Sequence, residues 1–197
     1  MKPRFLCYCG AAVLLLFLAA GCGPKAIKEA SVQDTPDKHF GRGMYELERG
    51  NLTSARSEFE RAVALDPEYG EALSGLAMIS ATQGEYKKAH ELADKALGKN
   101  GKSVESLVIK GRILAMERKG DDWVEKAAKQ YDKALAVNPS SAKALFFKGE
   151  AFKDGLQFSE AANLYSKVIA LKSDYAGQAD QAWERMQKIQ RASPGSE

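Results

Sequence analysis

Residues able to perform chemistry are few in this chain and lie far apart. It contains three cysteines, Cys7, Cys9 and Cys22, and two histidines, His39 and His90, among 197 residues. The two histidines lack the short spacing of a metal site, and we expect His39 to be a surface residue of a helix rather than a ligand. We therefore predict no catalytic residue, no metal site and no cofactor, and the chain is not expected to be an enzyme.

Other short motifs do not change this conclusion. Gly41 and Gly43 have the spacing of part of a phosphate loop, but no strand precedes them and the third glycine is missing. The G-x-S-x-G, H-E-x-x-H and C-x-x-C patterns do not occur. The adjacent acids Asp121 and Asp122 are a weak calcium signal, and we interpret them as the N-terminal cap of a helix.

The amino-terminal segment has the pattern of a secretory signal. Lys2 and Arg4 precede an apolar run from Phe5 to Ala20, which is shorter than the roughly 20 residues that span a bilayer. The run ends in "LAAGC", which resembles the lipobox of bacterial lipoproteins. The resemblance implies that residues 1–21 are a signal peptide and that Cys22 is lipidated. The alternative is an ordinary secreted protein with an accidental cysteine.

Lipidation accounts for the cysteine pattern. Cleavage would leave Cys22 as the single cysteine, which cannot form an internal disulfide. Two or three acyl chains would anchor the chain stably, and residues 22–35 would act as a flexible tether. Gly23 is not the aspartate that, in the family, retains lipoproteins in the inner membrane. The resemblance therefore implies the outer membrane, facing the periplasm.

Composition favours one folded domain without a nucleic-acid partner. The formal net charge is only +3, which gives no reason to expect a clustered basic face. A hydrophobic content of 45% is enough to build a core.

A repeated segment dominates the rest of the sequence. "RAVALDPEYGEAL" from Arg61 matches segments that begin at Lys95, Lys133 and Lys167, at offsets of 34, 38 and 34 residues. A period of 34 indicates stacked supersecondary units. The sequence from Pro36 onward resembles the tetratricopeptide repeat (TPR) family, whose unit is a helix-turn-helix.

The resemblance includes the small residues that let two helices approach closely. The eighth position of each repeat is Gly43, Ala77, Gly111 and Gly149. The twentieth is Ala55, Ala89, Ala127 and Ala161. We expect the two sets to face each other within each helix pair, because a larger residue there would cost about 1–3 kcal/mol. Large residues at the twenty-fourth position, Phe59, Tyr131 and Tyr165, would fill the adjacent hollow.

These patterns predict an all-α solenoid of about four repeats at residues 36–191, closed by a C-terminal capping helix, with a disordered tail at 192–197. Gly50, Gly84 and Gly155 mark turns where a left-handed conformation is expected. Trp183 is interpreted as part of the cap. Trp123, beside a four-residue insertion in the third repeat, is either a packing residue or an exposed anchor, and we favour packing. The expected helices are 37–49, 53–65, 70–83, 87–98, 104–118, 123–137, 142–154, 158–171 and 175–191.

In the family, the first helices of the repeats line a concave groove that binds a protein or peptide. The matching positions here predict an apolar groove bearing two methionines. Its residues are Phe40, Met44, Leu47, Ser74, Met78, Val108, Arg112, Phe146 and Glu150. The residues of the carboxylate clamp that some members use for chaperone C-termini are absent.

The resemblance implies a membrane-anchored adaptor that assists assembly of a cell-envelope machine for outer-membrane, type IV pilus or polysaccharide export functions. The alternatives are an adaptor for cell-wall or protein hydrolases and a carrier of an apolar ligand in the groove.

Overall fold

The computed structural model describes residues 34–192 of the chain. The predicted signal peptide, Cys22, most of the tether and residues 193–197 lie outside the described residues. Between residues 34 and 192 the chain forms nine helices and no strand. The helices are α1 (Pro36–Glu48), α2 (Leu52–Leu65), α3 (Gly70–Thr82), α4 (Tyr86–Lys99), α5 (Val104–Glu117), α6 (Trp123–Val137), α7 (Ala142–Asp154), α8 (Phe158–Ala170) and α9 (Ala176–Ala192).

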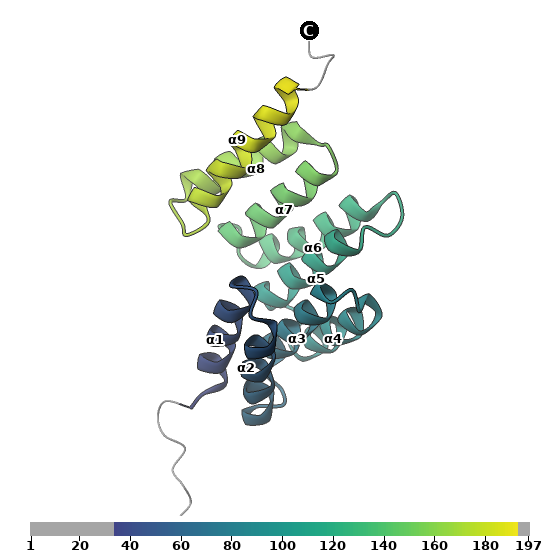
Figure 1. Cartoon of the computed structure of the whole chain (residues 1–197), viewed down its shortest axis with the longest axis vertical. Helices are drawn as coiled ribbons and strands as arrows, with labels where there is room; N and C mark the ends of the chain where they lie inside the picture. Colours follow the sequence, from purple (N-terminus) through teal and green to yellow (C-terminus); the bar gives the residue numbers. More distant parts are fainter. Residues whose placement is uncertain (1–33, 193–197) are drawn as a thin grey trace, which may run out of the picture. The chain divides into compact units, whose positions relative to one another are not determined.

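The helices form successive hairpins, as Figure 1 shows. Within a hairpin α1 packs on α2, α3 on α4, α5 on α6 and α7 on α8, and α9 packs on α8. The first helices also contact one another in order, from α1 through α3, α5 and α7 to α9. The all-α repeat fold is confirmed, and each helix end lies within one residue of its predicted position. None of the described helices is both long and apolar enough to cross a membrane.

Three first helices have a side-chain cap, whereas α3 and the second helices do not. Thr35, Ser103 and Ser141 cap α1, α5 and α7 by accepting a hydrogen bond from a backbone N–H three residues on. The second helices lack such caps and each begin with a large apolar residue. Trp123 is this residue in α6, packs partly buried against the core and lies 5.3 Å from the Arg118 guanidinium, which favours the packing interpretation. The prediction that Asp122 caps α6 is wrong for its side chain, which pairs with Lys126 at 2.8 Å.

Two of the three predicted left-handed glycines are confirmed. Gly50 and Gly84 both have φ of +79°. Gly155 does not, because its φ is −85° and Leu156 takes the left-handed conformation at +61°. Gly155 is required for space instead, since a Cβ there would lie 2.6 Å from a methyl group of Val124.

The small residues form the tight contacts of the fold. Ala77 and Ala89 lie in one core cluster, as predicted, but in the other three pairs the nearest partner is an aromatic ring rather than the alanine. The four alanines at the twentieth position are fully buried. The nearest atoms to Gly43, Gly111 and Gly149, however, belong to the aromatic rings of the twenty-fourth position. A Cβ on Gly111 would lie 2.6 Å from the Tyr131 ring, and one on Gly149 would lie 2.8 Å from the Tyr165 ring. The glycines therefore make room for a ring.

Phe59 occupies a special place in this scheme. Its ring lies against Gly43 of α1 and also against Gly75 of α3, and a Cβ on either glycine would approach a ring carbon to 2.5 Å. The ring is fully buried. One side chain of α2 thus fixes both neighbouring first helices.

The amino-terminal end carries a partly buried ionic cluster that was not predicted. His39 is buried, and its two ring nitrogens lie 2.6 Å from a Glu58 carboxylate oxygen and 2.5 Å from one of Asp34. Arg61 also binds Asp34, at 2.7 Å. The hydrogen bond to Asp34 raises the pKa of His39, and the same bond lowers the pKa of Asp34 to about 2. The expectation of a surface histidine is therefore wrong.

The other end is closed by α9. Ala179, Ala182 and Met186 are buried against the core of the last hairpin, and Trp183 packs on it partly buried. This arrangement agrees with a capping helix.

Candidate functional site

The first helices form one side of the stack, the first-helix face, which consists of the exposed surface of α1, α3, α5 and α7. The nine predicted groove residues divide unequally over it. Met44, Ser74, Met78, Val108 and Phe146 are buried, whereas Phe40, Leu47, Arg112 and Glu150 are partly exposed. The expectation of an accessible trough with two methionines is not met.

Packing between neighbouring first helices explains the burial. Met78 belongs to a core cluster with Ala77, Ile109 and Ile113. The Ser74 hydroxyl donates to the Ser106 hydroxyl at 2.8 Å, which joins α3 to α5 inside the stack. These positions of α3 hold the fold together and offer little surface to a partner.

Phe40 serves the first repeat. Its ring centroid is 5.9 Å from the ring centroids of both Phe59 and Tyr69. The ring therefore covers the aromatic core of the first hairpin, while keeping part of its surface exposed.

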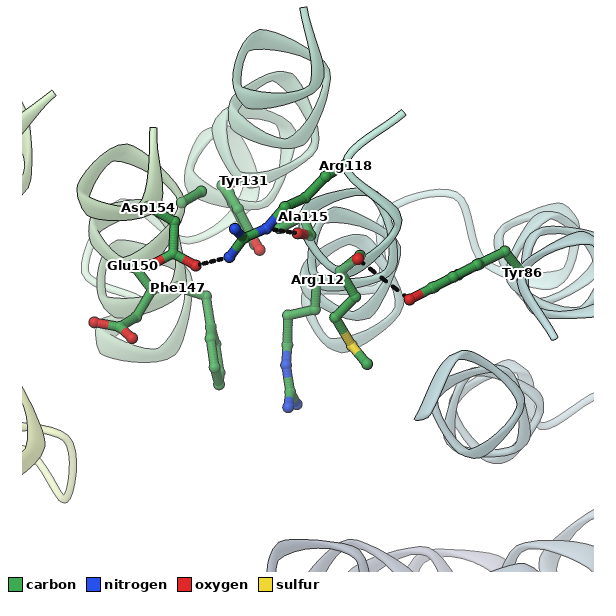
Figure 2. A pocket seen from close by; sticks show the side chains of 10 residues that line it. Tyr86, Arg112, Ala115, Arg118, Tyr131, Phe147, Glu150 and Asp154 are labelled. Carbon is green, nitrogen blue, oxygen red and sulfur yellow. Dashed lines mark hydrogen bonds and ion pairs between the residues drawn. The ribbon is translucent and has the colours of Figure 1, made fainter. Parts of the chain in front are cut away.

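The accessible part of the face lies between α5 and α7. A cavity of about 480 Å³ opens there, which we call the α5–α7 cavity (Figure 2). Tyr131 of α6 contributes to its lining and is itself buried, and burial raises the pKa of its hydroxyl. The lining residues are Tyr86, Arg112, Ala115, Met116, Arg118, Tyr131, Phe147, Glu150, Ala151 and Asp154.

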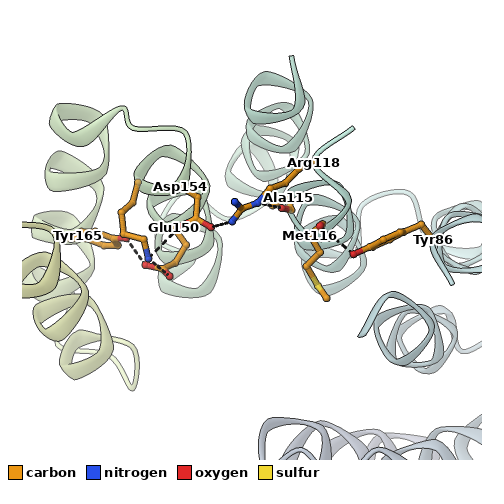
Figure 3. A network of polar contacts seen from close by, with 8 residues as sticks. Tyr86, Ala115, Met116, Arg118, Glu150, Asp154 and Tyr165 are labelled. Carbon is orange, nitrogen blue, oxygen red and sulfur yellow. Dashed lines mark hydrogen bonds and ion pairs between the residues drawn. The ribbon is translucent and has the colours of Figure 1, made fainter. Parts of the chain in front are cut away.

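Most polar groups of the α5–α7 cavity are already paired with one another (Figure 3). Arg118 donates to Asp154 at 2.5 Å, and the Tyr86 hydroxyl donates to the Met116 carbonyl at 3.2 Å. Glu150 accepts hydrogen bonds from Lys153 at 2.7 Å and from the Tyr165 hydroxyl. These pairs neutralise the charges of their members and hold the walls in place.

Arg112 is different. Its guanidinium carbon lies 4.2 Å from the centroid of the Phe147 ring, and both side chains point the same way from their helices in Figure 2. Within residues 34–192 the Arg112 side chain makes no hydrogen bond and no ion pair. Partial burial lowers the pKa of its guanidinium from the ordinary value.

A second, separate hollow shares one lining residue with the α5–α7 cavity. This hollow of about 220 Å³ lies between α7 and α9 and is lined in part by Glu150, Lys153 and Phe146. Because Glu150 lines both cavities, they adjoin each other at this residue.

Sequence reasoning missed several lining residues, although a signal was present. Phe147, Ala151 and Asp154 were not predicted, but with the predicted Glu150 they have the spacing i, i+3, i+4 and i+7 and form one stripe of α7. The family's groove positions predicted Phe146 at the start of this stripe, one residue too early. Tyr86 and Arg118 come from a helix start and a helix end and carry no periodic signal.

The described residues hold no group of three or more His, Cys, Asp or Glu side chains able to bind a metal ion. The α5–α7 cavity instead offers a partner the guanidinium of Arg112, the ring of Phe147 and walls of paired polar groups.

Solved structures with the same fold agree with the repeat architecture. A thermophilic TPR protein of Thermus thermophilus superposes with a TM-score of 0.65 at 19% identity, over 77% of this chain and 81% of that one. YrrB, described as a TPR protein with an unusual peptide-binding site, gives 0.52 at 20% identity, over 77% and 75%. Yeast Tom70 gives 0.54 at 18% identity, over 82% of this chain and 42% of its own. A comparison with curated proteins gives no significant match.

The sequence itself matches the family model described as "Tetratricopeptide repeat" over residues 40–104 and 115–176. A TPR fold supports protein–protein interaction in general, and proteins of this kind generally act as scaffolds without enzymatic activity. The match covers more than half of the sequence, and the chain belongs to the tetratricopeptide repeat family.

Proposed function

We propose that this protein is a lipid-anchored adaptor that holds a segment of a partner protein in the α5–α7 cavity. The observation that carries the proposal is the cavity itself, an open volume of about 480 Å³ on the first-helix face, with Phe147 and Arg112 accessible in it. A concave site with an apolar surface and a few convergent polar groups is the usual form of a recognition site. An extended or helical segment would lie along the face and place one side chain in the cavity.

The anchor and the location are supported by the sequence alone. The "LAAGC" segment that ends at Cys22 supports lipidation, and Gly23 supports the outer membrane facing the periplasm. We therefore place the adaptor in assembly of a cell-envelope machine of the outer-membrane, type IV pilus or polysaccharide export type. An adaptor for cell-wall or protein hydrolases would use the same surface.

A carrier of an apolar ligand fits the lining less well. Four charged side chains, two basic and two acidic, line the α5–α7 cavity. Desolvating them against an apolar ligand would cost free energy without forming new hydrogen bonds.

The anchor and the cavity can be tested together in the source cell. A photoreactive amino acid replaces Ala115 inside the cavity, and the matched control carries it at Lys129, an exposed residue of α6. We expect crosslinks to a discrete partner from position 115 and none from position 129, with the protein in the membrane fraction. Cys22→Ser should move the protein to the soluble fraction.

Two results would contradict the proposal. Continued membrane attachment of Cys22→Ser would show that Cys22 does not anchor the protein through a lipid. Identical crosslinks from positions 115 and 129 would place the partner elsewhere.

A further inference from the structure

The α5–α7 cavity carries one uncompensated positive charge. Among its charged lining residues, Arg118 is paired with Asp154 and Glu150 is paired with Lys153. Within residues 34–192, the Arg112 side chain is left without an ion-pair partner.

The two carboxylates whose charges act on Arg112 do not bind it. Glu105 and Glu48 act on Arg112 only through space, and neither makes a hydrogen bond to it. Glu105 accepts two hydrogen bonds from Lys143, at 2.9 and 3.1 Å, and Glu48 is exposed. Partial burial of an unpaired guanidinium is unfavourable. The Arg112 guanidinium would therefore gain hydrogen bonds and a counter-charge from a bound partner.

The position of Phe147 determines what can satisfy it. The ring lies 4.2 Å from the guanidinium carbon and stacks against one side of Arg112. An arginine supported on an aromatic ring loses little further conformational freedom when its N–H groups bind a planar carboxylate through two parallel hydrogen bonds.

We propose that Arg112, supported by Phe147, binds the side-chain carboxylate of an aspartate or glutamate in the partner segment. This inference rests on the proposed function and specifies the chemistry that the adaptor recognises. It needs only one arginine and one aromatic ring, and differs from the carboxylate clamp, whose residues this chain lacks.

The continuity of the face favours a side-chain carboxylate over a terminal one. The hollow on the other side of Glu150 would accept a segment that runs on from the α5–α7 cavity toward α9. A segment that continues in both directions presents its acid as a side chain.

The test uses the full chain with Cys22→Ser and two libraries of random twelve-residue peptides, one with free C-termini and one with both ends joined to a display scaffold. We expect aspartate or glutamate to be enriched at one internal position in both libraries. The enrichment should disappear with Arg112→Gln and remain with Arg56→Gln, a matched change at a half-exposed arginine of α2 that binds Gln83.

A selected peptide then gives the magnitude. Replacing its acid by the corresponding amide should weaken binding about 10- to 100-fold for the unaltered cavity, as expected for charge-assisted hydrogen bonds, and hardly at all for Arg112→Gln. Arg112→Lys keeps the charge but not the planar fork, so its loss should be intermediate. Circular dichroism confirms that the variants remain folded.

Each other outcome overturns the inference. Peptides bound without acid enrichment would disprove carboxylate recognition and leave the adaptor proposal intact. Enrichment of acids only at free C-termini would show that Arg112 binds a terminal carboxylate rather than a side-chain carboxylate. Failure to retain any peptide would overturn both proposals.

Discussion

Helices α3 and α7 occupy equivalent places in the stack, but α3 is mostly buried and α7 is mostly accessible. Each contacts the preceding and following first helices and its neighbouring second helices. Ten of the thirteen residues of α3 are buried, against five of thirteen in α7. Position in the repeat is therefore not what closes the first-helix face over α3 and opens it at α7.

Side-chain size and charge explain the difference. At the fifth, ninth and twelfth positions α3 has Ser74, Met78 and Ala81, so α5 can pack closely against it. At the same positions α7 has Phe146, Glu150 and Lys153. Phe147 and the paired charges of α7 hold its surface away from α5 and leave a cavity between them. A repeat can thus serve either as core or as binding surface without any change of fold.

We expect the largest effect from exchanging the residue types at the ninth positions of α3 and α7. Met78→Glu places a carboxylate where the side chain is 4% exposed and has no partner, which should cost about 3–5 kcal/mol of unfolding free energy. Glu150→Met removes a partly exposed ion pair and one hydrogen bond, and should cost less than about 2 kcal/mol. Urea titration followed by circular dichroism measures both. Equal costs would show that the two surfaces are equivalent after all.

A smaller effect tests the glycine contacts. Gly75→Ala would press on a Phe59 ring already held by Gly43 on another side, so we expect a cost of about 2–3 kcal/mol. Gly149→Ala would approach the Tyr165 ring to 2.8 Å and the Leu164 Cβ only to 3.4 Å, and should cost about 1–2 kcal/mol.

Gly41→Ala provides the matched control for these two variants. Apart from its chain neighbours and the backbone of its own helix, no described atom lies within 4 Å of a Cβ at this position of α1, so the change should stabilise the helix by about 0.5–1 kcal/mol. A destabilised Gly41→Ala would show that alanine is costly for a reason other than ring contacts.

The smallest effect concerns pH and is confined to the amino-terminal half. The raised pKa of His39 means that its stabilisation is complete below the unfolded pKa of about 6.5 and is lost as pH rises through the folded value. The lowered pKa of Asp34 makes its stabilisation complete above about 3.8, and it is lost as pH falls through about 2. The cluster should therefore be most stabilising between about pH 4 and 6.5.

Thermal unfolding at pH 5.5 and 8.5 measures this window. The melting temperature should fall by a few degrees at the higher pH, and the fall should shrink in His39→Gln. A pH response unchanged by His39→Gln would assign it to other groups.

The fold was predictable because its signals are local and repeated. Four alanines in register and an offset of 34 residues predict hairpins, and the structure places the helices there. Gly155 was misjudged because its need for space comes from Val124, more than thirty residues earlier in the chain. No pattern within α7 shows that contact.

The site was less predictable because the burial of a residue depends on its neighbours. The periodicity of the first helices gives Met78 and Glu150 the same role, yet one is core and the other lines a cavity. Likewise His39 is buried only because Glu58 and Asp34 come from two other segments to meet it. The positions of these three residues in the sequence do not predict that contact.

The ring of Phe59 has a consequence for how the array comes apart. Because backbone from α1 and from α3 grips it, the ring cannot leave one helix and keep its packing on the other. The first two hairpins therefore open as one cooperative block, and amide hydrogen exchange should be slowed to the same degree in both. Fraying at this end would have to release four helices at once.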